Sequence, residues 1–343
     1  MGSVIPVVIV AGFLGSGKTT LLNYLLRNNR GTRIGVVVND FGAVNIDAML
    51  VAGQVDAMVS LGNGCVCCAV DVSELDDLFG RLAQPRSAVD VIVVEASGLA
   101  EPRNLIRMVI ANPNPRIAYG GLVEVVDAEQ FEQTSARHPE LLTHLRLADL
   151  VLVNKADRVP PDALDGLRRE LSDWVGQVPV YATTHGHIDP GLLFDDRVPE
   201  EPKVAQQLSF DALLDEHDHD DPDHRHLHDD YTSVSFTSEA PLEPRALVSF
   251  LEDPPPGLFR AKGCVAFAVA GERRKFELHV VGRHVVFTPT TWARGEQRVS
   301  NLVLIGAGLD ADAARKRLRD TVFDGENLLD EQAMLGVWRY TPR

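Results

Sequence analysis

Eight residues close to the amino terminus have the types and spacing of a phosphate-binding loop. They read Gly-Phe-Leu-Gly-Ser-Gly-Lys-Thr and run from Gly12 to Thr19. The three glycines would let consecutive backbone N–H groups converge on anionic oxygens, and the start of a helix would add its positive dipole end. Lys18 would neutralise charge on the β- and γ-phosphates, and the hydroxyl of Thr19 would be a ligand of Mg²⁺. The expected nucleotide contacts are Gly12, Gly15, Ser16, Gly17, Lys18, Thr19 and Thr20.

The residues around this loop have the order of elements that phosphate binding requires. The apolar residues 4–10 precede the loop, and a leucine-rich, helix-like stretch at 19–28 follows it. A strand, a glycine turn and a helix in this order distinguish a phosphate loop from a glycine-rich turn that happens to precede a lysine. The chain is therefore predicted to bind a nucleoside triphosphate.

A second motif indicates which base the nucleotide carries. Asn154-Lys155-Ala156-Asp157 follows the apolar residues 150–153. The Asp157 carboxylate can accept two parallel hydrogen bonds, from guanine N1–H and from the exocyclic amine, and adenine offers no such pair. The Asn154 amide can support the Hoogsteen side of the base, while the aliphatic stem of Lys155 can lie across the ring. GTP is therefore expected rather than ATP.

Two further acidic loops are placed to hold Mg²⁺ and to guide hydrolysis. The strand-like residues 89–94 end in Glu95, and Gly98 follows three residues later. The Glu95 carboxylate would hold Mg²⁺ directly or through water, and the Gly98 N–H could meet a γ-phosphate. Asp40 follows another apolar run and could coordinate Mg²⁺ or orient the attacking water. Lys18, Asp40 and Glu95 are the predicted catalytic residues.

Three of the four cysteines are crowded into one loop after the expected strand at 55–60. They are Cys65, Cys67 and Cys68. Loops at the carboxyl ends of parallel strands gather along one edge, so these thiols are expected near the Mg²⁺ and γ-phosphate region. Thiolates favour Zn²⁺, Cu(I) or Co²⁺ over Mg²⁺, and a fourth ligand could be His, carboxylate or water. A transition-metal site is predicted, while a redox switch or small buried residues in a turn are alternative interpretations.

A histidine-rich segment follows at residues 217–230, which contain five histidines and six aspartates but nothing that would pack in a core. Such a segment is expected to be disordered and to bind transition metals loosely. Protonation of its imidazoles at and below about pH 6.5 would weaken that binding. A solubilising acidic linker with incidental histidines is the alternative. The candidate ligands are His217, His219, His224, His226 and His228.

Composition narrows the choice of partners. The 343 residues carry a formal net charge of −16 at pH 7. This acidic balance argues against nucleic acid and against anionic membrane surfaces as partners. No apolar run approaches the ~20 residues that span a bilayer, and the start of the chain lacks the basic region of a signal peptide. Adjacent thiols in an untargeted chain favour metal or redox chemistry, so the cytoplasm is the expected location.

The alternation of strand-like and helix-like segments predicts an α/β protein of the P-loop NTPase type. Residues 1–194 would form a doubly wound, mainly parallel sheet with helices on both faces. Residues 195–230 would be an acidic, histidine-rich linker, and residues 231–343 a smaller α+β domain with its own core. Expected strands are 4–10, 33–39, 55–60, 89–94, 117–126, 149–154, 178–182, 231–238, 262–269, 275–281, 284–288 and 299–306; expected helices include 71–84, 102–111, 160–175, 243–252 and 310–320.

Taken in order along nearly the full chain, these motifs closely resemble the CobW-like GTPases, relatives of the GTPases that insert nickel into urease and hydrogenase. The resemblance implies a metal-dependent regulatory GTPase that binds GTP and Mg²⁺ and delivers zinc or cobalt to a client metalloprotein. It also implies that a cysteine of the 65–68 loop is a ligand of the delivered ion, and that the loop after the second strand is switch I. The matching segments are 12–20, 39–42, 64–68, 95–98, 154–157, the histidine-rich linker, 260–263 and 302–306.

One loop departs from the family pattern. Where Glu-Phe-Gly-Glu is expected in the switch, this chain has Asp40-Phe41-Gly42-Ala43. Asp40 keeps a carboxylate on a shorter stem and Ala43 removes one, so slower intrinsic hydrolysis is expected. The favoured function is a GTP-hydrolysing metallochaperone whose Cys-x-Cys-Cys loop carries the metal. The alternatives are a metal-buffering protein with regulatory nucleotide binding, or a P-loop enzyme that acts on a small molecule.

Overall fold

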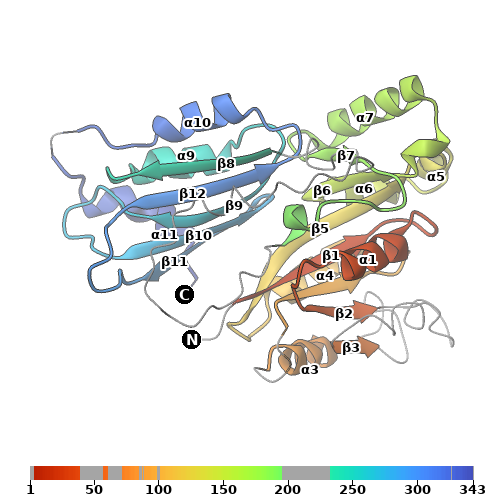
Figure 1. Cartoon of the computed structure of the whole chain (residues 1–343), viewed down its shortest axis with the longest axis horizontal. Helices are drawn as coiled ribbons and strands as arrows, with labels where there is room; N and C mark the ends of the chain where they lie inside the picture. Colours follow the sequence, from red (N-terminus) through yellow and green to blue (C-terminus); the bar gives the residue numbers. More distant parts are fainter. Residues whose placement is uncertain are drawn as a thin grey trace.

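Two β-sheets, each with its own helices, form the framework of the protein (Figure 1). The first sheet lies within residues 5–182 and the second within residues 232–306. In the part of the chain that the structure describes, no helix has the length and apolar character needed to cross a membrane. This computed structural model of the 343-residue chain describes residues 4–38, 57–60, 72–84, 87, 89–98, 101–194, 232–325 and 327–342.

The first sheet has seven strands in the order β3-β2-β4-β1-β5-β6-β7, and all of its registered pairs are parallel. From the central strand β1 the chain first builds one half of the sheet and then, from β5 onward, the other half. Such a reversal is where doubly wound sheets bind ligands, beyond the carboxyl ends of the strands. The strands are β1 (Ile5–Ala11), β2 (Ile34–Val38), β3 (Ala57–Ser60), β4 (Val91–Glu95), β5 (Ile117–Asp127), β6 (Leu150–Asn154) and β7 (Val180–Ala182).

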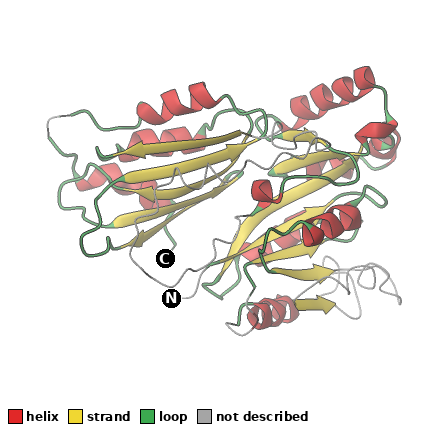
Figure 2. Ribbon diagram, in the orientation of Figure 1, coloured by secondary structure: helices red, strands yellow, loops and turns green. Residues whose placement is uncertain are grey.

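Helices cover both faces of this sheet because its central strand is apolar on both sides (Figure 2). In β1, Val8 and Val10 pack in one core cluster, while Ile5, Val7 and Ile9 pack in another. Continuous Val and Ile runs are typical of a parallel strand buried on both faces. The helices are α1 (Lys18–Arg27), α3 (Val72–Leu82), α4 (Pro102–Ile110), α5 (Phe131–Arg137), α6 (Glu140–Leu145), α7 (Pro161–Val175) and α8 (Pro190–Leu193).

The second sheet is antiparallel, in the order β11-β10-β9-β12-β8. Buried and partly exposed residues alternate along β12, as in a sheet with one face in a core. That core draws its buried members from residues 234–337. The elements are β8 (Thr232–Ser238), α9 (Pro244–Glu252), β9 (Leu258–Val265), β10 (Lys275–Val281), β11 (His284–Thr290), β12 (Ser300–Gly306), α10 (Ala311–Arg319), η5 (Glu331–Met334) and α11 (Leu335–Arg339).

The two sheets meet along a buried seam. Phe259 and Val281 come from strands of the second sheet but pack in a core cluster of the first. The Asp149 carboxylate accepts a hydrogen bond from the Tyr119 hydroxyl at 2.5 Å, and burial raises the pKa of Asp149 to about 6. A Cβ placed on Gly282 would lie 1.7 Å from Oδ1 of Asp149. Only glycine fits at this point of contact.

The predicted α/β architecture, with a parallel first sheet and an α+β second region, is confirmed. One strand prediction was wrong: the strand expected at 262–269 is β9, Leu258–Val265. The first four residues of β9 are all buried, since Phe259 packs toward the first sheet while Leu258 and Ala261 pack in the second core. The alternation that marks a strand is therefore hidden in the sequence.

The short helices α5, α6, α8 and α11, which have four to seven residues, were not predicted because they are too brief to show a helical period.

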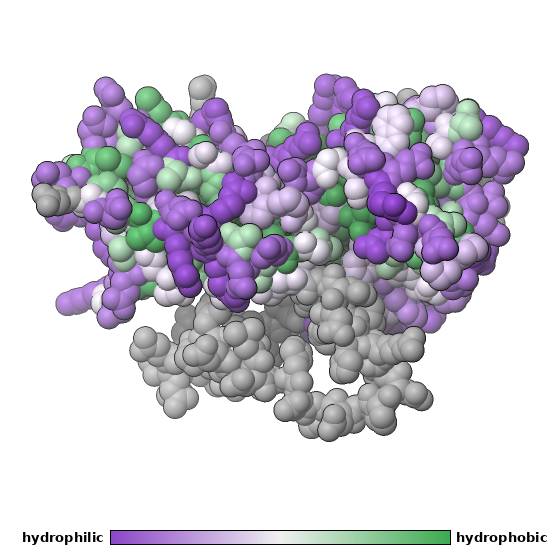
Figure 3. Space-filling view, turned by 90° about the horizontal axis from the view of Figure 1, so that it is seen from above, coloured by the Kyte–Doolittle hydropathy of each residue, from purple (hydrophilic) through white to green (hydrophobic). Residues whose placement is uncertain are grey.

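Hydrophilic and apolar residues are interspersed on the face that Figure 3 shows. Isolated apolar side chains on a protein surface are ordinary. Leu14 differs from the others in position, because it is 59% exposed within the predicted phosphate loop. The large apolar side chains that are exposed are Val4, Leu14, Ile110, Trp174, Leu328 and Leu335.

Candidate nucleotide site

The loop between β1 and α1 requires glycine at three positions. Gly12, Gly15 and Gly17 have φ angles of 141°, 75° and 106°, which side chains disfavour. A Cβ on Gly12 would lie 2.3 Å from the carbonyl oxygen of Val125, and one on Gly17 would lie 2.1 Å from Nδ2 of Asn154. The loop is thus pressed against β5 and β6, and its glycine spacing is required by packing as well as by conformation.

The amino end of α1 opens toward this loop. Gly17 is the N-cap residue, has a left-handed conformation and offers no side-chain acceptor. Backbone N–H groups of a first helical turn are not used inside the helix, so they are available to an anion. Thr20, predicted to contact the nucleotide, lies in this turn and is exposed.

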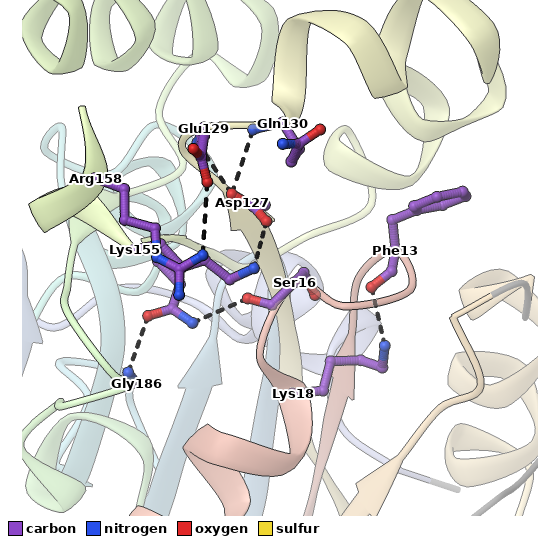
Figure 4. A network of polar contacts seen from close by, with 10 residues as sticks. Phe13, Ser16, Lys18, Asp127, Glu129, Gln130, Lys155, Arg158 and Gly186 are labelled. Carbon is purple, nitrogen blue, oxygen red and sulfur yellow. Dashed lines mark hydrogen bonds and ion pairs between the residues drawn. The ribbon is translucent and has the colours of Figure 1, made fainter.

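The Lys18 ammonium is held inside the loop. The residue is only 8% exposed, and its Nζ donates hydrogen bonds to the carbonyl oxygens of Gly12 at 3.0 Å and Phe13 at 3.1 Å. Figure 4 shows the contact with Phe13. Phosphate oxygens are stronger acceptors for an ammonium than neutral carbonyls, so a bound phosphate can take over these bonds. The Lys18 charge therefore lies inside the predicted phosphate loop.

Thr19 and Glu95 meet beside Lys18. Oγ1 of Thr19 donates to Oε1 of Glu95 at 2.8 Å. Glu95 ends β4, is 2% exposed and pairs in register with Val10 of β1. A hydroxyl and a carboxylate that converge next to phosphate oxygens form the donor set that Mg²⁺ uses in nucleotide sites. The residues present therefore fit Mg²⁺, which Thr19 and Glu95 would hold.

Gly98 lets the loop after β4 approach the phosphate loop closely. A Cβ at this position would lie 2.7 Å from the backbone nitrogen of Leu14. The two loops that were predicted to surround the γ-phosphate are thus adjacent in space. Any side chain at position 98 would push them apart.

At the base end, Asn154 ties three segments together. Its Nδ2 donates to the carbonyl oxygen of Ser16 at 2.9 Å, and its Oδ1 accepts from the N–H of Gly186 at 2.9 Å. Both ends of the amide contact the protein, although the sequence suggested that this amide supports the Hoogsteen side of the base. In this structure Asn154 fixes the phosphate loop relative to the loop after β7, and its contact with the base stays a prediction.

Lys155 is oriented by an acidic residue of β5. It has a left-handed conformation with a φ of 60°, and its Nζ lies 2.6 Å from Oδ2 of Asp127. The other oxygen of Asp127 accepts from the N–H groups of Glu129 and Gln130, which fixes the carboxylate (Figure 4). Asp157, in the short helix η2 (Ala156–Arg158), is exposed beside Lys155. An exposed carboxylate next to an extended lysine stem can meet the edge and the face of a base.

Two contributors were missed in the sequence. Asp127 follows the buried residues of β5 at the same sheet edge as Glu95, so the rule that identified Glu95 applies to it equally. Gly186 carried no comparable signal, because its role depends on a loop that returns from β7 to Asn154. A Cβ on Gly186 would lie 2.7 Å from Cα of Leu21, so this loop also packs on α1.

Several predicted ligands lie outside the described residues. These include Asp40, the three clustered cysteines and the five linker histidines: Asp40, Cys65, Cys67, Cys68, His217, His219, His224, His226 and His228. Within the described ranges there is no group of three or more His, Cys, Asp or Glu arranged to hold a metal ion. The fourth cysteine, Cys264 of β9, is a free thiol.

Residues 6–182 match the CobW/HypB/UreG nucleotide-binding domain, and residues 231–322 match the cobalamin synthesis protein cobW C-terminal domain. The chain belongs to the CobW/HypB/UreG family. The residues that match the nucleotide-binding domain contain the phosphate loop, the Thr19–Glu95 pair and the Asn154 network.

Curated relatives of the CobW type span nearly the whole chain. The zinc chaperone CobW of Sinorhizobium sp is 28% identical over 358 residues, which cover 91% of this chain and 95% of the relative. The zinc chaperone CobW of Pseudomonas aeruginosa is 30% identical over 358 residues, covering 92% and 91%. The zinc-regulated GTPase metalloprotein activator 1 of Dictyostelium discoideum is 30% identical over 210 residues, covering 49% and 44%.

Proposed function

We propose that this protein is a GTP-hydrolysing metallochaperone that handles zinc. The observation that carries the proposal is the 2.8 Å contact between Thr19 and Glu95 beside the buried Lys18, inside a glycine loop. Those groups are what phosphoryl transfer needs: a fixed cation, a ligand pair for Mg²⁺ and a backbone cradle. The names of the relatives, two zinc chaperones and a zinc-regulated GTPase, support zinc and GTP as the ligands.

In hydrolysis, the chain's own residues bind and orient the triphosphate. Lys18 exchanges its bonds to Gly12 and Phe13 for phosphate oxygens and stabilises the charge that develops during transfer. Thr19 and Glu95 would hold Mg²⁺, which when bound neutralises charge on the β- and γ-phosphates. Asp40 or Glu95 orients the attacking water. The expected slow intrinsic rate follows from the short stem of Asp40 and from Ala43 in the switch.

The base end selects guanine. Asp157 accepts from the N1–H and the exocyclic amine of guanine, and the stem of Lys155 covers the ring. Asp127 keeps Lys155 extended, because its carboxylate is itself fixed by two backbone N–H groups. In the same orientation adenine presents an unprotonated N1 and a C2–H, so the Asp157 carboxylate would find no donor, which is the basis of discrimination.

The metal belongs to the loop of Cys65, Cys67 and Cys68. We propose that these thiolates bind Zn²⁺, with Co²⁺ as the other candidate, when GTP is bound. Release of phosphate after hydrolysis then loosens the site, and a client metalloprotein takes the ion. The coupling must be reciprocal, so zinc must tighten GTP binding by the same factor by which GTP tightens zinc binding. The histidine-rich residues 217–230 would collect metal loosely and supply it to the cysteines.

The test is a zinc titration in two nucleotide states. The full chain is loaded with a non-hydrolysable GTP analogue or with GDP, and the affinity for Zn²⁺ is measured by competition with a chelating dye. We expect at least a tenfold tighter affinity in the GTP-analogue state, which corresponds to a coupling of about 1.4 kcal/mol. Equal affinities in the two states would refute the chaperone cycle.

A cysteine pair provides the matched control. Cys67→Ser should remove the nucleotide-dependent part of zinc binding, because a hydroxyl is a poor ligand for a soft metal. Cys264→Ser, in the second sheet, should leave it unchanged. If both variants behave alike, the metal site does not lie in the cysteine loop.

A further inference from the structure

A cavity lies beside the phosphate loop, on the side of α5 and α6. Its volume is about 390 Å³, and it is enclosed by the loop, the carboxyl half of β5, α5 and α6. Apolar side chains form much of its wall: Phe13, Phe131, Leu141 and Leu145. Among the described residues that line it, Lys18, Thr19 and Glu95 are absent. The cavity therefore lies apart from the predicted Mg²⁺ ligands, although it shares Gly15, Ser16 and Lys155 with the predicted nucleotide contacts.

A buried carboxyl group belongs to this cavity. Glu124 of β5 lines it and is only 3% exposed. Among the residues that the structure describes, its Oε2 has no hydrogen-bond partner. Burial raises the pKa of Glu124 to about 8, and the charge of Lys18 offsets part of that effect. A carboxyl oxygen without a partner is costly in a folded protein, and the charge of Lys18 offsets only part of that cost for Glu124.

The charged groups around the cavity are engaged elsewhere. Lys18 donates to two carbonyl oxygens of the phosphate loop, and Lys155 is paired with Asp127. His138 contacts Glu140 at 3.1 Å and stacks on Phe13 with ring centroids 4.7 Å apart. Arg137 lines the cavity but is an exposed residue at the end of α5. None of these hydrogen bonds and ion pairs involves Glu124, whose side chain lines the cavity and whose buried Oε2 has no donor partner among the described residues.

We propose that this cavity binds an alkylammonium group, a primary amine on an apolar stem such as that of a lysine side chain. The ammonium would donate to the Glu124 carboxylate, and the stem would lie along Phe13, Phe131, Leu141 and Leu145. A cation pairs a buried acid more strongly than a neutral donor can. The net charge of −16 also favours a cationic ligand. This inference goes beyond the GTPase function and does not depend on it.

Binding must be accompanied by loss of a proton from Glu124. At pH 7 a carboxyl group with a pKa of about 8 is mostly protonated. When the ammonium binds, the carboxyl proton of Glu124 passes to solvent, and the ammonium keeps all of its own protons. The ionised fraction rises about tenfold between pH 7 and pH 9, while an alkylammonium with a pKa near 10.4 stays charged. The affinity should therefore rise about tenfold over this range. A neutral ligand that binds the protonated acid would show the opposite trend.

The experiment is a calorimetric titration of the full chain, loaded with GDP and Mg²⁺, with n-butylammonium chloride. Repeating it at pH 7 in two buffers with different ionisation enthalpies counts the released protons. We expect saturable binding, release of nearly one proton and an about tenfold gain in affinity at pH 9. 1-Butanol, which has the same stem without charge, should bind at least tenfold more weakly.

Two glutamine variants locate the site. Glu124→Gln keeps the size of the side chain and should weaken butylammonium binding at least tenfold, with unchanged fold by circular dichroism. Glu140→Gln, on the neighbouring helix α6, is the control and should bind normally. Absence of saturable binding, equal binding to Glu124→Gln, or an affinity that falls with pH would each overturn the proposal. Equal binding is measured on a Glu124→Gln variant shown to be folded, and the pH dependence is measured on the wild-type protein.

A further titration distinguishes between two possible sources of the ligand. Nα-acetyl-lysine amide carries the same ammonium on a peptide-like backbone. If it binds as tightly as butylammonium, the source is a lysine of a partner protein. If it binds much more weakly while butylammonium still binds, the source is a small free amine. Both outcomes support the alkylammonium site.

Discussion

The phosphate end and the base end of the nucleotide site are built in different ways. At the phosphate end, glycines allow the backbone to approach, and two close contacts fix the loop at Gly12 and Gly17. At the base end, side chains do the positioning: Asn154 ties two loops, and Asp127 holds Lys155. A backbone cradle offers no tolerance to added atoms, whereas a side-chain network can lose a member and relax. The two ends should therefore respond differently to substitution.

Removing the Lys18 ammonium should give the largest effect, and it gives the clearest test of the difference between the phosphate end and the base end. Lys18→Ala is expected to lower kcat for GTP hydrolysis by about a thousandfold, since it deletes the charge nearest the transferred phosphoryl group. Lys155→Ala, at the base end, should mainly raise KM and leave kcat within about threefold. Steady-state phosphate release measures both. Equal losses of kcat in the two variants would mean that the ends are not functionally distinct.

A single methyl group at the phosphate end should be nearly as damaging. Gly17→Ala is expected to weaken GDP binding roughly a hundredfold, because its Cβ would lie 2.1 Å from Nδ2 of Asn154 and its φ of 106° disfavours alanine. Gly31→Ala is the matched control, with a φ of 80° and no atom within 4 Å of the added Cβ. Fluorescent-nucleotide titration compares them. Similar affinities in both variants would show that the close contact at Gly17 does not limit nucleotide binding.

Glu124, on the strand between the two ends, should make stability depend on pH. Its folded-state pKa of about 8 lies above the ordinary value, so its contribution to stability is fully present below pH 4.5 and is lost as the pH rises toward 8. Relative to Glu124→Gln, the wild-type protein should lose about 2 kcal/mol of unfolding free energy between pH 6 and pH 8. Urea denaturation at both pH values measures the difference. A constant difference across this range would show that Glu124 is ionised throughout.

The smallest effect is expected at Asp127. Asp127→Asn should raise KM for GTP three- to tenfold, about 1 kcal/mol, with kcat unchanged, because the partly buried ion pair only orients Lys155. Glu129→Gln, which contributes to a more exposed pair with Arg158 at 3.6 Å, is the control and should have no effect. A loss of kcat in Asp127→Asn would place Asp127 in the chemistry of the phosphate end and so remove the distinction.

The sequence predicted the phosphate end far better than the base end. The glycine loop, Lys18, Thr19 and Glu95 are read from local spacing and from the order of strand, turn and helix. The Asn154 contacts to Ser16 and Gly186 join residues 138 and 32 positions apart, and no local pattern encodes them. Most strand positions followed from Val and Ile runs, but β9 did not, since Phe259 is buried against the other sheet and masks the alternation.

The contact at Gly282 also has a mechanical meaning. Because not even one methyl group fits between this turn and Oδ1 of Asp149, the two halves of the protein are in tight contact at this point. Sliding along this joint is blocked, and a hinge motion that opened it would uncover the Asp149 carboxylate together with the Tyr119 hydroxyl bonded to it. We therefore expect the two sheets to move together at this contact rather than to slide past each other.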